Sequence, residues 1–385
     1  MTSVIPLQKK IGILGGGQLA RMLVLEGHKM GLNMYVLSQS ASDPAALVTP
    51  NWQMGDVHNP IHVKNFLKLV DVATIESEFL SEKVLAEARN LLSVEIHPST
   101  NLIAEFSDRL KQKKWFEKFN IQTSAFAELH EKSDVYGFIA NTRKKSRQSM
   151  VFKRRHYGYD GHGIHIINDK RELESWLNKN KSQLHNYIVE DKINFHRELA
   201  IQIAINAKKE VCIFPLVEWR AKNSRCLWVK GPVYHKDLSS MLKRIIHALK
   251  ESNYVGLAAF EFFDTTHGLL VNEMAPRVHN SGHYSLEGTI PNQFSAHLQA
   301  ILNMSLPKAP MLTAPGFAML NIIDCSTKMP VIDSPGKVAF HWYGKAENRI
   351  GRKMGHLTAL APTPEKALLK VLKVRRTLTR NFTSG

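Results

Sequence analysis

The sequence contains little cysteine and no long hydrophobic run. Its three cysteines, Cys212, Cys226 and Cys325, lie far apart in 385 residues and form no CxxC pair or Cys/His cluster, which argues against a disulfide framework and a structural zinc site. Free thiols in a reducing compartment are therefore expected. Because no stretch of about 18 uninterrupted apolar residues occurs, no membrane span is expected. The segment from Met1 to Lys10 lacks the apolar core of a signal peptide, so we expect a cytoplasmic protein.

Acidic residues are also scarce relative to basic ones. The chain has 34 Asp and Glu against 51 Lys and Arg, a formal net charge of +17. An excess of this sign suits anionic partners such as nucleic acid, acidic surfaces or phosphorylated small molecules. The basic runs at 143–155 and 373–380 lack the interleaved aromatic residues of a platform for single-stranded nucleic acid. Solvated surfaces are the favoured explanation, and nucleic-acid binding stays an alternative that the sequence does not require.

The first hundred residues alternate between strand-like and helix-like segments. Lys10–Leu14, Asn33–Leu37 and Val70–Ile75 have the apolar runs of buried strands, and Gln18–Glu26 and Phe66–Leu69 have helical spacing. Strands separated by helices predict a parallel sheet with crossover connections, and hence an α/β protein. At about 100–200 residues per domain, the remaining length predicts one or two further domains.

Short strands dominate the middle of the chain. The predicted strands are 150–153, 163–167, 187–189, 198–205 and 210–215, and the predicted helices are 108–119, 239–252 and one that starts at about 364. The stretch 307–315 contains prolines and no periodic pattern, which is typical of a boundary between domains.

A glycine cluster, Gly15-Gly16-Gly17-Gln18-Leu19-Ala20, follows the first predicted strand and opens the first helix. Glycines in such a turn let backbone amides approach a phosphate at the helix N-terminus. The NAD-binding form of this turn also requires an acidic residue at the end of the second strand, where this chain has Leu37-Ser38-Gln39. We therefore expect a turn that cradles an anion, or a merely tight turn, and an NAD-linked oxidoreductase is disfavoured.

A second glycine-rich segment runs from Lys153 to Gly163 between two predicted strands. It contains three glycines and the three consecutive cations Lys153, Arg154 and Arg155. Such a flap can close over a polyphosphate and offer it backbone amides and side-chain charge together. An ordinary hairpin needs fewer glycines, and it is the alternative interpretation.

Two glutamates lie on neighbouring strands further along the chain. Residues 258–263 and 268–274 are predicted to form a hairpin. If Phe263 pairs with Leu269, Glu261 lies opposite Val271, and Glu273 is its diagonal neighbour on the same face. Mg²⁺ prefers one or two carboxylates together with substrate phosphates. The hairpin therefore predicts a magnesium site at Glu261 and Glu273, with a solvated strand face as the alternative.

Two further motifs complete the pattern: the run from Asn272 to His283, which reads NEMAPRVHNSGH, and Gly351–His356, which reads GRKMGH. With the flap and the two glutamates, these motifs make the chain resemble ATP-grasp enzymes, and among them the 5-(carboxyamino)imidazole ribonucleotide synthase family of purine biosynthesis. The resemblance implies an N-terminal Rossmann-like domain (1–108), an ATP-grasp domain with a glycine-rich flap (109–308) and a small β-rich C-terminal domain (309–385). A homodimer is expected by the resemblance only.

The resemblance also implies a reaction. A member of this family is expected to be an ADP-forming ligase that carboxylates 5-aminoimidazole ribonucleotide with ATP and bicarbonate through carboxyphosphate, using Mg²⁺, with two ions expected. Two alternatives stay open: an ATP-grasp carboxylate–amine ligase with another acceptor, and a non-catalytic protein that binds nucleotides or nucleic acid on this scaffold.

Family roles are carried over to the matching positions of this chain. The expected ATP-binding residues are Arg109, Lys153, the flap residues Gly158, Tyr159, Asp160, Gly161, His162, Gly163 and Ile164, the hinge residues Glu190, Asp191, Lys192 and Ile193, and also Glu198 and Asn272. Among these, Glu198 is expected to bind the ribose hydroxyls. Glu261 and Glu273 are expected to hold the metal.

The acceptor side follows from the same resemblance. Catalytic roles are expected for Tyr159, Asp160 and Arg277, where Asp160 orients or deprotonates the amine and Arg277 stabilises the charge of carboxyphosphate. The expected substrate-binding residues are Gln18, His279, Asn280, Lys345, Arg352 and Lys353. The chain departs from the family after Glu218, where Asn and then a nucleotide-contacting His are usual and Trp219-Arg220-Ala221-Lys222 stands here. Arg220 or Lys222 is expected to supply the missing contact electrostatically.

Overall fold

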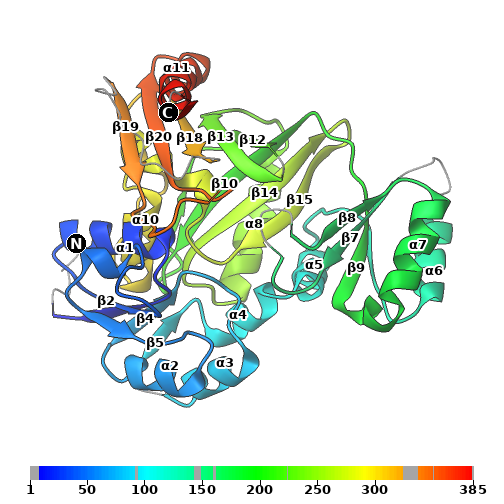
Figure 1. Ribbon diagram of the computed structural model, residues 1–385, viewed down its shortest axis with the longest axis horizontal. Helices are drawn as coiled ribbons and strands as arrows, with labels where there is room; N and C mark the ends of the chain where they lie inside the picture. The colour runs from blue at the N-terminus through cyan, green and yellow to red at the C-terminus, as the bar shows by residue number, and fades with distance from the viewer. Residues whose placement is uncertain are drawn as a thin grey trace.

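The computed structural model describes residues 8–91, 94–142, 149–158, 162–222, 224–323, 337–349 and 351–383. Three sheets carry the architecture, and Figure 1 shows them as an N-terminal sheet, a long central sheet and a small sheet at one end of the molecule. Among the described residues, no helix combines the length and the hydrophobicity that crossing a bilayer requires.

The N-terminal sheet is wholly parallel, as predicted. Its order is β3-β2-β1-β4-β5, so β1 lies between β2 and β4 at the point where the strand order reverses. Buried apolar side chains cover both faces of this sheet. Its elements are β1 (Lys10–Leu14), α1 (Gln18–Lys29), β2 (Asn33–Ser38), η1 (Ala46–Val48), β3 (Trp52–Met54), α2 (Pro60–Leu67), β4 (Val72–Ile75), α3 (Glu82–Arg89), β5 (Glu95–His97) and α4 (Thr100–Phe106).

The small sheet is antiparallel, in the order β6-β9-β7-β8, and two helices pack with it around a core that includes Phe152 and Trp176. α5 (Arg109–Lys118) connects the N-terminal domain to this part of the chain. The elements are β6 (Phe126–Glu128), α6 (Lys132–Thr142), β7 (Met150–Arg154), β8 (Ile164–Ile167), α7 (Lys170–Asn180), η2 (Lys181–Asn186) and β9 (Tyr187–Asp191).

The central sheet is antiparallel, and its main order is β15-β14-β10-β12-β13-β18-β20-β19, with β11 paired to β10. Because β13 pairs with β18, the C-terminal strands continue the sheet of the preceding domain. The strands are β10 (Arg197–Ile205), β11 (Val211–Ile213), β12 (Val217–Lys222), β13 (Arg225–Gly231), β14 (Gly256–Thr265), β15 (Gly268–Ala275), β18 (Gly316–Ile322), β19 (Val338–Trp342) and β20 (Gly355–Ala361).

Helices cover the central sheet. α8 (Leu238–Glu251) buries Met241, Ile245, Ala248 and Leu249, the spacing of one helix face, against one side of β10 and β14. α11 (Pro364–Thr383) packs on β18 and β20, and it lies at the top of the molecule in Figure 1. The remaining elements are η3 (Asn280–Gly282), α9 (Ser285–Gly288), β16 (Thr289–Ile290), α10 (Gln293–Ile301) and β17 (Met311–Leu312).

The hairpin of β14 and β15 has a different register from the predicted one. Phe263 pairs with Leu270 rather than Leu269, and Glu261 pairs directly with Glu273 rather than diagonally. The cause is a β-bulge at Asn272, because the partner of Phe262 is Val271 while the partner of Glu261 is already Glu273. An extra residue in one strand shifts all later pairs by one position. The bulge therefore brings the two carboxylates closer than the regular hairpin would.

Candidate active site

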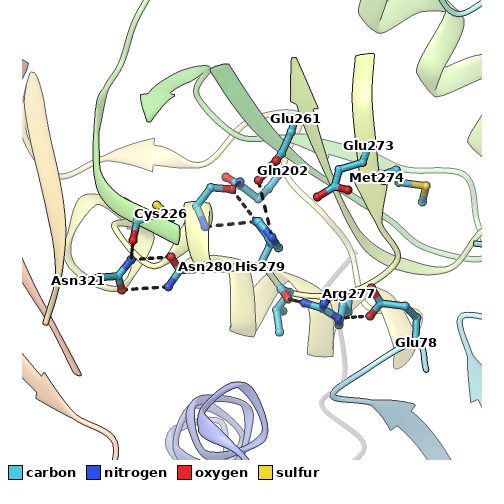
Figure 2. A network of polar contacts seen from close by, with 12 residues as sticks. Glu78, Gln202, Cys226, Glu261, Glu273, Met274, Arg277, His279, Asn280 and Asn321 are labelled. Atoms are coloured by element: carbon cyan, nitrogen blue, oxygen red, sulfur yellow. Dashed lines mark hydrogen bonds and ion pairs between the residues drawn. The ribbon is translucent and has the colours of Figure 1, made fainter. Parts of the chain in front are cut away.

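The direct pair of Glu261 and Glu273 lies on the face of the central sheet that α8 does not cover. Opposite residues of an antiparallel pair have Cβ atoms about 4.5–5.5 Å apart, and Figure 2 shows both side chains on the same side of the sheet. The side chain of Glu273 is 39% exposed and that of Glu261 only 12%, so a ligand can reach the pair from the Glu273 side.

This donor set fits a hard divalent cation. Mg²⁺ takes one or two protein carboxylates and completes its shell with waters and substrate phosphates. The described residues contain no group of three or more His, Cys, Asp or Glu side chains suited to a metal ion, so the pair is not a closed all-protein site. Glu198 on β10 lies on the same face, and burial, together with the nearby carboxylate of Glu273, raises the pKa of Glu198 to about 7.

A buried charge network lies beside this pair. Lys153 on β7 donates to Asn272 at 2.9 Å and to Glu190 at 3.1 Å. Lys113 on α5 donates to Ser124 at 2.9 Å and lies 3.2 Å from Glu190. Burial raises the pKa of Glu190, but the two lysines outweigh burial and lower it to about 2. The network thus holds the ammonium of Lys153 next to the bulge that shapes the carboxylate pair.

Sequence reasoning missed Lys113. Burial lowers its pKa to about 8, against the attraction of Glu190. The sequence signal that could have indicated its burial is its position in the helix. Lys113 lies three residues after Leu110 and three before Phe116, on the buried face of α5. A lysine at such a position must find an anionic partner inside the protein. Gln112 beside it was missed as well. Its side-chain amide donates to the backbone carbonyl of Met274 on β15 and accepts a hydrogen bond from the backbone N–H of the same residue.

Arg109 connects the flap to the carboxylates. Its guanidinium donates to the carbonyls of Arg154 and Gly158 at 2.9 and 3.1 Å and lies 3.3 Å from the carboxylate of Glu273. A Cβ atom at position 158 would lie 1.9 Å from the guanidinium, so the close approach requires Gly158. Of the other flap residues, Ile164 begins β8 and His162 and Gly163 directly precede it, whereas the predicted residues Tyr159, Asp160 and Gly161 lie outside the described residues.

The predicted hinge residues lie where the small sheet meets the central one. Glu190 and Asp191 end β9, and Lys192 and Ile193 begin the connection to β10. The carboxylate of Glu190 is engaged by the two lysines, so a contact of Glu190 itself with a base would be made by its backbone groups.

Three acceptor-side residues, Arg277, His279 and Asn280, lie in the segment that follows β15, as Figure 2 shows. Arg277 forms an ion pair with Glu78. Glu78 follows β4 of the N-terminal domain and lies 199 positions before Arg277 in the sequence. His279 lies 3.9 Å from Glu261, and burial, with Arg277 and Lys353 nearby, lowers its pKa to about 3. The neutral imidazole therefore hydrogen-bonds rather than carries charge, and Asn280 is held by Asn321 on β18.

The basic residues near the C-terminus lie in the loop between β19 and β20. Lys345 donates to the carbonyl of Lys353 at 2.8 Å, and Arg352 donates to the carbonyl of Glu347 at 3.0 Å. A Cβ atom on Gly344 would lie 3.6 Å from Arg21 of α1, so the loop lies against the helix that Gln18 begins. The structure therefore places Lys345, Arg352 and Lys353 in one loop, which approaches the side chain of Arg21 on α1.

The first glycine turn holds an anion of the protein itself. The carboxylate of Glu76, at the end of β4, accepts hydrogen bonds from the amides of Gly17 at 2.5 Å and Leu19 at 3.2 Å. The predicted turn that cradles an anion is thus present, and two of its amides bind a buried carboxylate of the chain itself, which caps the helix N-terminus. A cavity of about 500 Å³ opens beside this turn, between Ser38, Glu76 and Tyr157 of the flap base.

Comparisons with known proteins agree with this geometry. The chain matches the ribonucleotide synthetase preATP-grasp domain over residues 8–105, the ATP-grasp domain over 114–294 and the phosphoribosylaminoimidazole carboxylase C-terminal domain over 318–370. It is 32% identical to the N5-carboxyaminoimidazole ribonucleotide synthase of Saccharolobus solfataricus, over 99% of each chain. The chain belongs to the N5-carboxyaminoimidazole ribonucleotide synthase family.

Solved structures of this family have the same fold. The enzyme from Thermus thermophilus has a TM-score of 0.84 at 30% identity, covering 96% of this chain and 98% of that one. The enzyme from Aspergillus clavatus, in complex with ADP and 5-aminoimidazole ribonucleotide, has a TM-score of 0.84 at 27% identity and covers 97% of this chain and 99% of that one. The predicted ATP-grasp fold and family are thereby confirmed.

The structure corrects the expectation for the segment where the chain departs from the N5-carboxyaminoimidazole ribonucleotide synthase pattern. Along β12, successive side chains alternate between the two faces of the sheet. Trp219 pairs with Glu198 and therefore shares the face of the carboxylates. Arg220 and Lys222 are exposed and belong to the opposite face, so neither can replace a nucleotide contact on the carboxylate side.

Proposed function

We propose that the protein is an ATP-dependent carboxylase that converts 5-aminoimidazole ribonucleotide, bicarbonate and ATP into N5-carboxyaminoimidazole ribonucleotide, ADP and phosphate. One observation carries the proposal: the paired carboxylates Glu261 and Glu273 lie between the ammonium of Lys153 and the neutral His279. The pair and Lys153 suit a metal-bound triphosphate, and His279 and Arg277 suit an anionic acceptor beside it. Membership of the N5-carboxyaminoimidazole ribonucleotide synthase family supports the same reaction.

In the proposed first step, a bicarbonate oxygen attacks the γ-phosphorus of ATP, the bond to the β-phosphate breaks, and ADP leaves. Glu261 and Glu273 would hold Mg²⁺, with two ions expected, and the metal when bound neutralises charge on the phosphates. Lys153 and Arg109 add fixed positive charge on the other side of the phosphates. Positioning and charge stabilisation are the main contributions that a protein makes to phosphoryl transfer.

In the proposed second step, the amine of 5-aminoimidazole ribonucleotide attacks the carboxyl carbon of carboxyphosphate, or the CO₂ it releases. Phosphate leaves, and the amine gives up a proton. Tyr159 and Asp160 are proposed for this step from the sequence alone, with Asp160 as the group that orients or deprotonates the amine. Arg277, held by Glu78, would stabilise the negative charge of the intermediate.

The remaining substrate contacts are proposed in the same way. The hinge segment 190–193 would receive the adenine, and the segment 158–164 would close over the phosphates. Lys345, Arg352 and Lys353, with Gln18 at the start of α1, would bind the 5′-phosphate, and Asn280 and His279 would border the imidazole. The cavity beside Glu76 is lined by Gly17, which directly precedes Gln18, and is proposed as space for part of the acceptor. A cytoplasmic homodimer is proposed as well.

The test is phosphate release from Mg·ATP and bicarbonate by the purified protein, with and without 5-aminoimidazole ribonucleotide. Strong stimulation by the ribonucleotide is expected. A rate of ATP hydrolysis that is the same with and without the ribonucleotide would instead indicate a ligase with another acceptor. Nucleotide binding without any hydrolysis would indicate a non-catalytic binding protein, and its excess charge would then favour a nucleic-acid partner.

A further inference from the structure

Trp219 lies next to the carboxylate that is expected to bind a ribose. In the central sheet, Glu198 on β10 has Phe263 on β14 as its neighbour on one side and Trp219 on β12 on the other. Residues paired across antiparallel strands project to the same face, with Cβ atoms about 4.5–5.5 Å apart. Glu261 belongs to this face too, because it pairs with Ala200, two residues after Glu198. The candidate site residues on this face therefore include Trp219 on β12 as well as Glu198 on β10 and Glu261 on β14.

The indole of Trp219 has an unused hydrogen-bond donor. Its Nε1 atom is buried and has no hydrogen-bond partner among the described residues. Two other tryptophans show the usual pattern, since Trp52 donates to Ser38 at 3.0 Å and Trp115 to Ser252 at 2.9 Å. Trp176 also lacks a partner, but it is a buried member of the core of the small domain, whereas Trp219 is only partly buried and packs against the core cluster of Ala200 and Val217 on the carboxylate face.

A buried donor without a partner is costly, and the large majority of buried polar side-chain atoms in native proteins have a partner in the protein or in ordered water, so an unpartnered donor needs an explanation. The neighbouring Glu198 has the opposite property, because its carboxylate offers acceptors on the same face. A hydroxyl group between the two would satisfy both, since its oxygen accepts from the indole while its proton is donated to the carboxylate. Ribose hydroxyls are groups of this kind, whereas phosphate oxygens cannot donate to a carboxylate.

We propose that Trp219 is a further nucleotide-binding residue, whose indole N–H donates to a ribose hydroxyl of ATP while that hydroxyl donates to Glu198. The inference rests on the proposed function, because it takes ATP as the nucleotide of this site. Trp219 acts in binding, so its loss weakens ATP affinity and leaves the affinity for the acceptor ribonucleotide unchanged.

Trp228 provides a matched control on the adjacent strand. It pairs with Arg220, one position along β12 from Trp219, so its side chain belongs to the opposite face. Its ring packs with Leu320 and the other residues of the core beneath α11. The two tryptophans are thus close in the sheet, and only Trp219 can contact a nucleotide on the carboxylate face.

The experiment compares the wild-type chain with Trp219→Phe and Trp228→Phe, each of which keeps an aromatic ring. Tryptophan fluorescence is recorded while Mg·ATP is added, and affinities for ATP and for 2′,3′-dideoxy-ATP are measured by calorimetry. We expect a nucleotide-dependent fluorescence change in the wild type and in Trp228→Phe, and its loss in Trp219→Phe. Loss of one neutral hydrogen bond predicts an affinity for ATP about 2- to 12-fold weaker in Trp219→Phe, and equal affinities of all three proteins for the dideoxy nucleotide.

Two results would overturn the inference while the proposed function survives. One is an unchanged fluorescence response and ATP affinity in Trp219→Phe. The other is an affinity loss of the same size for ATP and for the dideoxy nucleotide, because the ribose hydroxyls would then have no part in it. Failure of the wild-type protein to bind ATP at all would overturn the proposed function, and the inference with it.

Discussion

The buried carboxylate of Glu190 provides a quantitative test of how the site is held together. Glu190 is enclosed with Lys113 and Lys153, at 3.2 and 3.1 Å, and it also accepts a hydrogen bond from Ser124 at 2.6 Å. The substitution Glu190→Gln removes the charge and keeps the size and one carbonyl acceptor. It therefore isolates the electrostatic contribution of the carboxylate to folding.

The magnitude follows from the pKa of Glu190, which lies at about 2 in the folded protein against an ordinary value of 4.5. A pKa that is lower in the folded state stabilises folding at pH values above the ordinary pKa, and this stabilisation is lost as the pH falls toward the folded pKa. The difference corresponds to about 3 kcal/mol at neutral pH and about 2 kcal/mol near pH 3.5. Glu190→Gln should thus destabilise the protein most at neutral pH.

The measurement is urea-induced unfolding of wild type and variant, followed by circular dichroism at several pH values between about 7 and 3.5. Glu128→Gln is the control, because Glu128 pairs with the exposed Lys114 on the surface of the same small domain, and such pairs contribute about 1 kcal/mol or less. A loss below about 1 kcal/mol for Glu190→Gln at neutral pH, or a loss that does not shrink in acid, would refute the assignment of stability to this network.

Three further predictions concern the site and its support. Glu273→Gln should lower kcat by about 100-fold or more by removing a metal ligand, and a wild-type rate in phosphate-release assays would contradict the metal assignment. Lys353→Ala should raise KM for the ribonucleotide about 10-fold or more through loss of a charge-assisted contact, and an unchanged KM would remove Lys353 from the phosphate site. Gly17→Ala should unfold at lower urea than wild type, because the new Cβ would lie 2.3 Å from Glu76. Gly137→Ala, whose Cβ meets nothing within 4 Å, should be at least as stable as wild type, and equal effects of the two changes would contradict the steric argument.

Several features of the fold could be predicted from local pattern alone. The strand Lys10–Leu14 was predicted with its observed bounds, and the parallel order of the N-terminal sheet followed from strands that alternate with helices. The helix predicted at 66–69 in fact begins at Pro60, where Asn59 caps its N-terminus. Apolar periodicity locates the middle of an element well, whereas its end depends on one capping side chain.

The candidate site residues can be proposed from the sequence, whereas the geometry that the structure gives them cannot. The pairing of Glu261 with Glu273 depends on the bulge at Asn272, and Asn272 is held in turn by Lys153 from the small domain. The pattern of apolar residues along β15 does not reveal a bulge at Asn272, because polar residues interrupt that pattern at this point. The bulged residue contacts a side chain of another domain, and that contact is not visible in the local pattern.

Sequence by itself determined the residue types of the chemistry: two glutamates in a hairpin, a basic glycine-rich flap, and the two motifs that indicate the family. Tertiary structure alone decided which anion the first glycine turn holds, since Glu76 lies 59 positions from Gly17. It also decided that Lys113 supports Glu190 and that Trp219 rather than Arg220 faces the carboxylates. Local pattern is set by neighbours along the chain, whereas these contacts depend on strand register and on the packing of distant segments, which only the folded chain brings together.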